Sequence, residues 1–283
     1  MMKDDEKKAI LCPQCRRLIS RDEPVCPHCG LSRPGTRRVA AMLGRLGSGA
    51  LDPIRIVLFS NVALYLLSLL LNPSSLGFSL NPLSFLSPSE TSLFYLGATG
   101  TVPILGYGRW WTLFTASFLH GGLLHIFFNM AALTQLGPFV WRQFGFWRFW
   151  IIYLASGIGG FLLSLVAGVP FTIGASAGLC GLIGAILYYG RSRGGFLGEM
   201  ISRQAMGWIV GLAIFGLLLP GINNWAHGGG LLAGIGAAFL TGHRDRGPET
   251  AFHRALGAVL AGLTVLLLLY AVAGAAAMAL NLH

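Results

Sequence analysis

Seven apolar stretches alternate with polar segments along the 283-residue chain. Each stretch is close to the roughly 20 residues that a helix needs to cross the hydrocarbon core of a bilayer. The pattern predicts an all-α polytopic membrane protein with seven transmembrane helices. They are expected at residues 54–72, 119–140, 148–168, 173–190, 205–220, 225–242 and 255–278, of which the fifth is the shortest.

Charge is unevenly distributed along the chain, which is 54% hydrophobic and carries a net charge of +10. Basic proteins often bind nucleic acid, but here 19 of the 20 lysines and arginines lie at or before the first stretch or in the segments after the second, fourth and sixth. Because short cytoplasmic loops carry the excess of positive charge, we expect a cytoplasmic amino terminus and a carboxyl terminus outside, in a plasma (inner) membrane. The predicted partner of these charges is the lipid bilayer, and no nucleic acid is required.

The longest segment between two stretches, residues 73–118, is predicted to lie outside. Four prolines interrupt it, yet it is too apolar for a free loop. Its GRWWTLF sequence supplies two tryptophans of the kind that settle at the headgroup level. We expect a re-entrant or interfacial structure that packs on the bundle.

The amino-terminal sequence CPQCRRLISRDEPVCPHCG, residues 12–30, contains two Cys-x-x-Cys motifs. Four thiolates on two such turns can bind Zn²⁺ tetrahedrally, and about 19 residues are too few to fold around a core without a metal. Two disulfides are the competing interpretation, which the reducing cytosol disfavours. The sequence therefore predicts a structural zinc site with the ligands Cys12, Cys15, Cys26 and Cys29.

These patterns divide the chain into four predicted parts. They are a cytosolic zinc-ribbon-like module at 1–34, a basic linker at 35–53, a six-helix domain at 54–242, and a cytosolic loop with a seventh helix at 243–283. A four-cysteine zinc site has no open coordination position, so we expect it to be structural or adaptor-like rather than catalytic. Its predicted location suggests a cytosolic partner.

Polar side chains are rare in the apolar stretches, and four lie near the beginnings of the second, fourth and sixth: His125, Asn129, Ser176 and His227. In the predicted topology these three helices run from outside to inside, so the four side chains share one shallow depth near the outer surface. Rows of small residues let such helices approach closely in lipid, which would bring Ser176 within reach of His227.

A serine hydroxyl becomes a nucleophile when a base takes its proton, and His227 is the base that these positions offer. No Asp or Glu lies in any of the stretches, so a Ser-His dyad is the remaining arrangement. The backbone N–H of Ser176, the Asn129 amide and the His125 ring could donate hydrogen bonds to the oxyanion of an acyl transfer.

Over residues 105–242 the chain resembles the rhomboid intramembrane serine proteases. The resemblance rests on H-x4-H-x3-N from His120, G-x-S-x-x-x-x-G around Ser176 and A-H-x-x-G-x-x-x-G around His227. It implies a six-helix core with Ser176 as nucleophile, His227 as general base, and oxyanion support from His125 and Asn129. It also implies cleavage of single-pass transmembrane proteins near the outer face, with no catalytic cofactor. The seventh helix is similar to a carboxy-terminal addition found in part of the family.

Three residues depart from the family pattern. Ala177 follows the serine where glycine is usual, and Thr112 follows Trp111 where arginine is usual, with Arg109 as a substitute. Cys180 stands one turn after the serine, where an aromatic residue often stacks on the base.

Two other functions remain open from the sequence. A catalytically inactive rhomboid-like protein would bind membrane clients through the same scaffold, although such a scaffold does not need a nucleophile. A transporter would place its polar groups on broken helices near the membrane midplane, whereas these lie near one surface.

Overall fold

The computed structural model describes residues 9–12, 15, 17–20, 23–29, 52–72, 77–78, 85–219 and 221–281. All but the last two residues of the predicted linker at 35–53 fall outside the described residues. The chain divides into two compact units, Met1–Arg55 and Ile56–His283, each of which is described by itself.

The amino-terminal unit contains a small antiparallel hairpin. Strand β1 (Ala9–Leu11) pairs with β2 (Leu18–Ser20), with Ile10 opposite Ile19. Its core consists of Cys12, Ile19 and Cys26, with Ile10, Cys15 and Cys29 packed against them. Four of these six side chains are thiols, so apolar burial contributes little to the stability of this unit.

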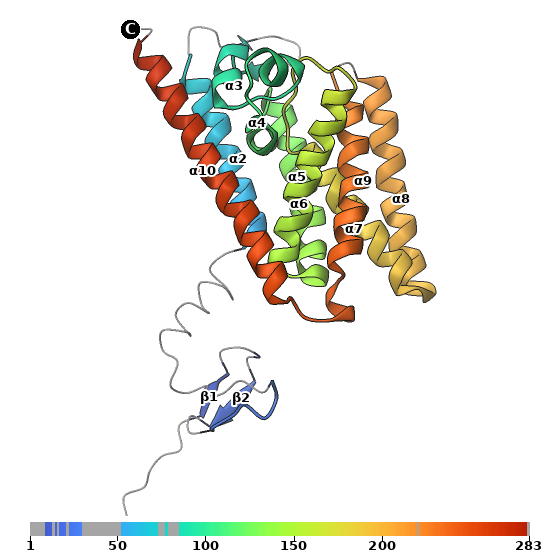
Figure 1. Ribbon diagram of the computed structural model, residues 1–283. Helices are drawn as coiled ribbons and strands as arrows, with labels where there is room; N and C mark the ends of the chain where they lie inside the picture. Colours follow the sequence, from blue (N-terminus) through green and yellow to red (C-terminus); the bar gives the residue numbers. More distant parts are fainter. Residues whose placement is uncertain are drawn as a thin grey trace, which may run out of the picture. The chain divides into compact units, whose positions relative to one another are not determined.

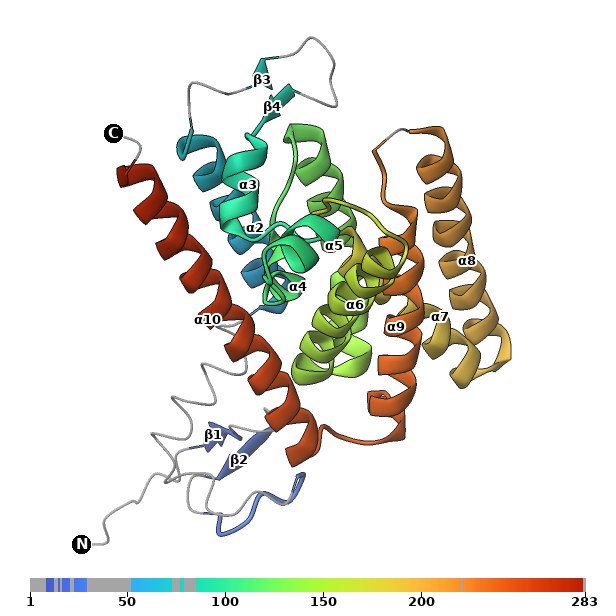
Figure 2. The ribbon, with the colours of Figure 1, turned by 45° about the horizontal axis from the view of Figure 1, so that its top comes forward.

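Seven helices of 18 or more residues make up most of the described part of the bundle (Figures 1 and 2). Each overlaps one of the seven predicted apolar stretches, which confirms a mostly helical, polytopic architecture. Helices α8 and α10 lie at opposite edges of the bundle in both views. The helices are α2 (Pro53–Leu70), α5 (Leu123–Phe144), α6 (Phe146–Val166), α7 (Ser176–Arg193), α8 (Gly195–Leu218), α9 (Asn224–Thr241) and α10 (Ala251–Asn281).

Several predicted boundaries differ from the observed ones by three residues or more, and two of the helix starts show why. The second stretch was expected from residue 119, but α5 begins at Leu123, because the preceding Gly121–Gly122 pair lies in a turn. The fifth was expected at 205–220, but α8 begins ten residues earlier, at Gly195. Its first three turns carry polar residues, so the apolar pattern did not include them in the predicted stretch. Among these residues are Glu199 and Arg203, which form an i,i+4 ion pair.

Five of the seven helices are long and apolar enough to cross a membrane: α2, α5, α6, α8 and α10. Helix α7 ends in two arginines, and α9 contains Asn224, His227 and five glycines, so neither meets that criterion by composition. Most residues of α7 are buried by neighbouring helices, and it therefore needs little apolar surface for lipid. The count of seven spans stays a prediction.

The predicted outer segment folds into short elements that gather at one end of the bundle, where α9 begins (Figure 1). Those elements are the strands β3 (Gly77–Phe78) and β4 (Phe85–Ser87), helix α3 (Glu90–Leu96), the π-helix η3 (Val102–Gly106), α4 (Thr112–Thr115) and the 3₁₀ helix η4 (Ala116–Phe118). A further 3₁₀ turn, η5 (Arg244–Arg246), precedes α10.

Arg109 and Trp111 connect the short elements to each other and to α10. The Arg109 guanidinium donates to the Phe94 carbonyl over 2.6 Å and lies 4.6 Å from the Trp111 ring centroid. Trp111 also contacts Tyr270 of α10, edge to face, with ring centroids 5.4 Å apart. Arg109 thus stacks on Trp111. In the family pattern an arginine directly follows this tryptophan, whereas here Thr112 does.

Candidate active site

Ser176 is the first residue of α7 and follows a short extended segment. That segment is fixed by Thr172, whose N–H donates to Thr99 O over 2.7 Å while its carbonyl accepts from Thr99 N over 3.1 Å. Gly174 N donates to Ala116 O over 2.9 Å. Gly174 has a φ of +127°, a left-handed conformation that favours glycine. Hydrogen bonds to Thr99 and Ala116 therefore fix the backbone that leads into α7.

His227 lies in the first turn of α9, and its Nε2 is 2.9 Å from Ser176 Oγ. Asn223 is the N-cap of α9, and its side chain accepts from Ala226 N over 3.1 Å. The other ring nitrogen of His227, Nδ1, is buried and has no hydrogen-bond partner among the described residues. The predicted pair is thus in hydrogen-bond contact, with no carboxylate behind the imidazole in the described part of the chain.

Close packing of α7 and α9 brings this pair together. A Cβ on Gly230 would overlap Ala177 O, and a Cβ on Gly234 would overlap the backbone of Gly181. These two glycines of α9 lie against the backbone of α7, so the two helices can approach at this distance only without side chains there. Gly178 instead faces α6, and a Cβ on Gly178 would be 2.7 Å from Cε2 of Tyr153.

His125 approaches the serine from α5, and Asn129 lies one turn further along the same helix. A Cβ on Gly174 would be 2.8 Å from His125 Nε2 and 3.6 Å from Ser176 Oγ, so both atoms lie close to one point. His125 Nδ1 accepts from Gly121 N over 3.3 Å. Asn129, which is buried, donates its Nδ2 to the His125 carbonyl over 2.9 Å.

His120 is fully buried, and its ring packs edge-to-face on His125 with centroids 4.9 Å apart. Neither of its ring nitrogens has a hydrogen-bond partner among the described residues. The sequence motif contains this histidine, but only the structure shows that it supports the ring of His125.

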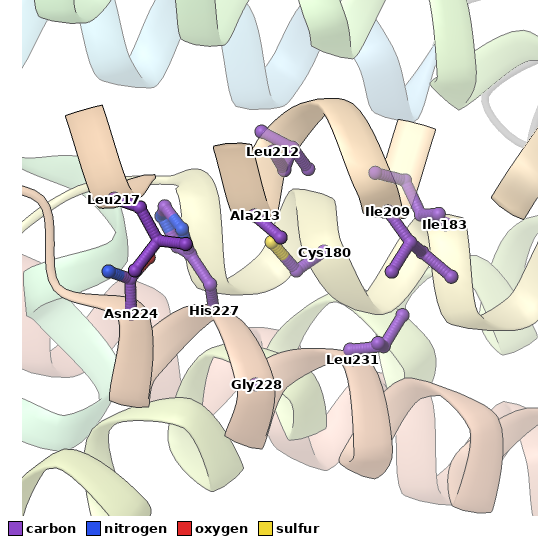
Figure 3. A pocket seen from close by; sticks show the side chains of 10 residues that line it. All are labelled: Cys180, Ile183, Ile209, Leu212, Ala213, Leu217, Asn224, His227, Gly228 and Leu231. Atoms are coloured by element: carbon purple, nitrogen blue, oxygen red, sulfur yellow. The ribbon is translucent and has the colours of Figure 1, made fainter. Parts of the chain in front are cut away.

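An apolar cavity of about 290 Å³ lies beside His227, between α7, α8 and α9 (Figure 3). Cys180 lies in the cavity wall, at the position where the family pattern often has an aromatic residue. Its small side chain leaves room next to the imidazole. His227 and Asn224 lie near one another in the lining, together with Leu217 of α8. The other lining residues are Ile183, Ile209, Leu212, Ala213, Gly228 and Leu231.

The four cysteines of the amino-terminal unit cluster as the two motifs predict. Their sulfur atoms all lie within 4.8 Å of one another. Cys12 Sγ is 3.6 Å from Cys29 Sγ, and Cys15 Sγ is 3.7 Å from Cys26 Sγ. A tetrahedral ion with bonds of about 2.3 Å to sulfur separates its ligands by about 3.8 Å. The four thiols could therefore hold a metal ion.

Comparison with known proteins relates the chain to the rhomboid proteins. The chain is 36% identical over 168 residues to RHOMBOID-like protein 6, mitochondrial, of Arabidopsis thaliana, which covers 58% of this chain and 55% of that protein. It is 37% identical over 139 residues to Rhomboid protease GluP of Bacillus subtilis (strain 168), which covers 49% and 27%. It is 31% identical over 204 residues to RHOMBOID-like protein 1 of Arabidopsis thaliana, which covers 65% and 52%.

The chain thus spans about half the length of the two Arabidopsis thaliana relatives and about a quarter of Rhomboid protease GluP. The family description that matches is the Rhomboid domain, over residues 107–244. That range contains α5 to α9 and with them every residue of the site around Ser176. The chain therefore contains a rhomboid domain, and over about half of its length it is similar to rhomboid proteins.

Proposed function

We propose that this protein is an intramembrane serine endopeptidase that cleaves transmembrane protein substrates. The observation that supports this most strongly is the 2.9 Å separation of Ser176 Oγ and His227 Nε2, two side chains that lie 51 residues apart in the sequence. A nucleophile and a base within hydrogen-bond reach are the minimum for covalent acyl transfer. A relative that is named a rhomboid protease adds support.

In the proposed reaction, Ser176 Oγ attacks the carbonyl carbon of the scissile peptide bond and passes its proton to His227 Nε2. The negative charge on the carbonyl oxygen is stabilised by the Ser176 N–H, the His125 ring and the Asn129 amide. His227 then protonates the leaving amine as the C–N bond breaks, which gives an acyl-enzyme. Water, deprotonated by His227, hydrolyses this ester and restores the serine.

Asn129 must reorient to act as an oxyanion donor, because its Nδ2 donates to its own helix in the unliganded site. A rotation of its side chain would exchange that intrahelical hydrogen bond for one to the substrate. Hydrogen bonds at unliganded catalytic sites are often long or misdirected and tighten when substrate binds.

The proposed substrates are single-pass transmembrane proteins, cut near the outer face of the membrane. The cavity beside His227 offers room for an apolar side chain of such a substrate, since an apolar cavity of about 150 Å³ can already hold a benzene ring. The distribution of basic residues supports a plasma (inner) membrane location with the amino terminus in the cytoplasm and the carboxyl terminus outside.

The proposal is tested by mixing purified protein in liposomes with a single-pass substrate and comparing the wild type with Ser176→Ala and His227→Ala. We expect cleavage by the wild type alone. Equal cleavage by all three would refute the dyad. No cleavage by any of them, together with substrate binding, would favour the catalytically inactive client-binding function.

For the amino-terminal unit we propose a structural Zn²⁺ ion on Cys12, Cys15, Cys26 and Cys29, and a role in binding a cytosolic partner. Thiolates select soft metals, and the sulfur spacing suits tetrahedral coordination. Metal analysis of the purified protein should find about one zinc per chain, which Cys12→Ser should remove. Retention of zinc in that variant would contradict the assignment, and proteolysis activity provides an independent check on the second unit.

A further inference from the structure

We propose that Asn223 is a positioning residue that holds Ser176 and His227 at hydrogen-bond distance by bridging their two chain segments. The inference rests on the proposed protease function. Asn223 touches neither reacting side chain through a hydrogen bond that we observe, and it acts through Thr172 and through its own helix.

The Asn223 side chain joins three separate parts of the fold. Its Nδ2 donates to Thr172 Oγ1 over 2.9 Å and to Ser164 Oγ of α6 over 2.6 Å. Its Oδ1 accepts from Ala226 N over 3.1 Å. An ordinary N-cap needs only the last of these bonds, so the two donated bonds require another explanation.

Asn223 and Thr172 occupy equivalent places on the two segments that carry the dyad. Asn223 precedes His227 by four residues, and His227 N donates to the Asn223 carbonyl over 3.2 Å. Thr172 precedes Ser176 by four residues, across the Gly174 turn. The Asn223–Thr172 bond and the Ser176–His227 bond therefore both join the chain at the beginning of α7 to the beginning of α9, and on the α9 side they lie about one turn apart.

The two acceptors of Asn223 are themselves held in place. Ser164 is fully buried on α6, and Thr172 is 6% exposed and paired through its backbone with Thr99. Because both acceptors are anchored, the Asn223 amide positions the start of α9 instead of following a mobile partner. Small displacements matter here, since a misplacement of about 1 Å at a catalytic pair can cost on the order of 10²-fold in rate.

Two substitutions separate the bridge from the helix cap. Asn223→Ser retains a good N-cap oxygen but is too short to reach both hydroxyls, and Thr172→Val removes one hydroxyl while keeping the side-chain shape. Asn223→Asp should retain the bridge, because both hydroxyls can donate to a carboxylate. Thr134→Val is the matched control, since Thr134 lies on the exposed side of α5 and bonds only within its helix.

The experiment measures kcat and KM for cleavage of a single-pass substrate in liposomes, and the rate of labelling by a fluorophosphonate. We expect Asn223→Ser and Thr172→Val each to lower kcat and the labelling rate by about tenfold or more, with KM and the unfolding temperature nearly unchanged. Their double variant should be no slower than the slower single variant, because both break one bridge. Asn223→Asp should recover most of the rate, and Thr134→Val should match the wild type.

Wild-type kcat in both bridge variants, or effects that multiply in the double variant, would overturn the positioning role. Loss of kcat that tracks loss of folded protein would do the same, since Asn223 would then be merely structural. Ser176→Ala is run in the same series. If Ser176→Ala is inactive and the bridge variants keep the wild-type kcat, only this inference is refuted. If cleavage survives in Ser176→Ala, both the protease function and this inference are refuted.

Discussion

Replacing Gly230 with alanine should separate the dyad without touching either of its members. Gly230 lies three residues after His227, and its missing side chain faces Ala177, the neighbour of Ser176. The added methyl carbon would overlap Ala177 O and lie 2.9 Å from Ala177 C. Carbon atoms in contact are normally about 3.5–4.0 Å apart, so α7 and α9 must move apart by on the order of 1 Å.

That displacement passes directly to the Ser176–His227 pair, because each of its members is within one turn of the contact. Their separation of 2.9 Å would grow to about 4 Å, beyond hydrogen-bond range. We expect kcat/KM to fall by about 10²-fold. Overpacking of this kind typically costs about 1–3 kcal/mol of stability, which leaves the domain folded.

Gly236→Ala is the matched control, because the same helix gains the same methyl group at a position with no atom within 4 Å. Both variants and the wild type are compared in the liposome cleavage assay, with thermal unfolding to confirm that each is folded. Equal cleavage rates for Gly230→Ala and Gly236→Ala would show that the close contact at Gly230 does not set the geometry of the pair.

Three further predictions concern other parts of the fold, each measured by thermal unfolding in detergent. Burial lowers the pKa of His243 from its ordinary 6.5, so the unfolded chain binds a proton more readily than the folded chain. The stability that this residue contributes is therefore complete above about pH 6.5 and is lost as the pH falls towards the pKa of the folded state. His243→Gln should flatten this decline in stability. A variant with the pH profile of the wild type would contradict this prediction. Glu249 Oε1 accepts from Trp147 N over 2.7 Å at the start of α6, so Glu249→Ala should cost about 1–2 kcal/mol, whereas Glu199→Ala, which removes an exposed ion pair, should cost little. Tyr270→Ala should lower the free energy of unfolding by about 1 kcal/mol or more, because it removes the ring that packs on Trp111. Tyr270→Phe keeps the ring and should be nearly neutral. Equal losses of stability in the two variants would show that the ring contact is not the cause.

The helices could be predicted from the sequence because lipid demands long apolar runs, and these runs are visible without a fold. The start of α8 could not, because its polar residues interrupt the apolar run while a contact with α7 holds it. A Cβ on Gly198 would be 2.5 Å from Gly190 O, so the polar first turns of α8 pack closely on the end of α7. Such a contact leaves no periodic signal in hydropathy.

The positions of Ser176 and His227 could be predicted because both begin helices that share one direction, which gives them a common depth. The role of Asn223 could not be predicted in this way, since an asparagine before a helix resembles any N-cap. Only the tertiary structure brings Thr172 and Ser164 to its amide. The cavity at Cys180 likewise arises from what three helices leave unfilled, and no single residue signals it.

We expect His227 to activate the Ser176 hydroxyl as a nucleophile. The most direct test of this activation is labelling of the full-length protein with a fluorophosphonate, followed by mass spectrometry to locate the modified residue. We expect one adduct, on Ser176, that is absent from Ser176→Ala and strongly reduced in His227→Ala. Labelling of Ser176 that is equally fast without His227, or an adduct on a different serine, would contradict this expectation.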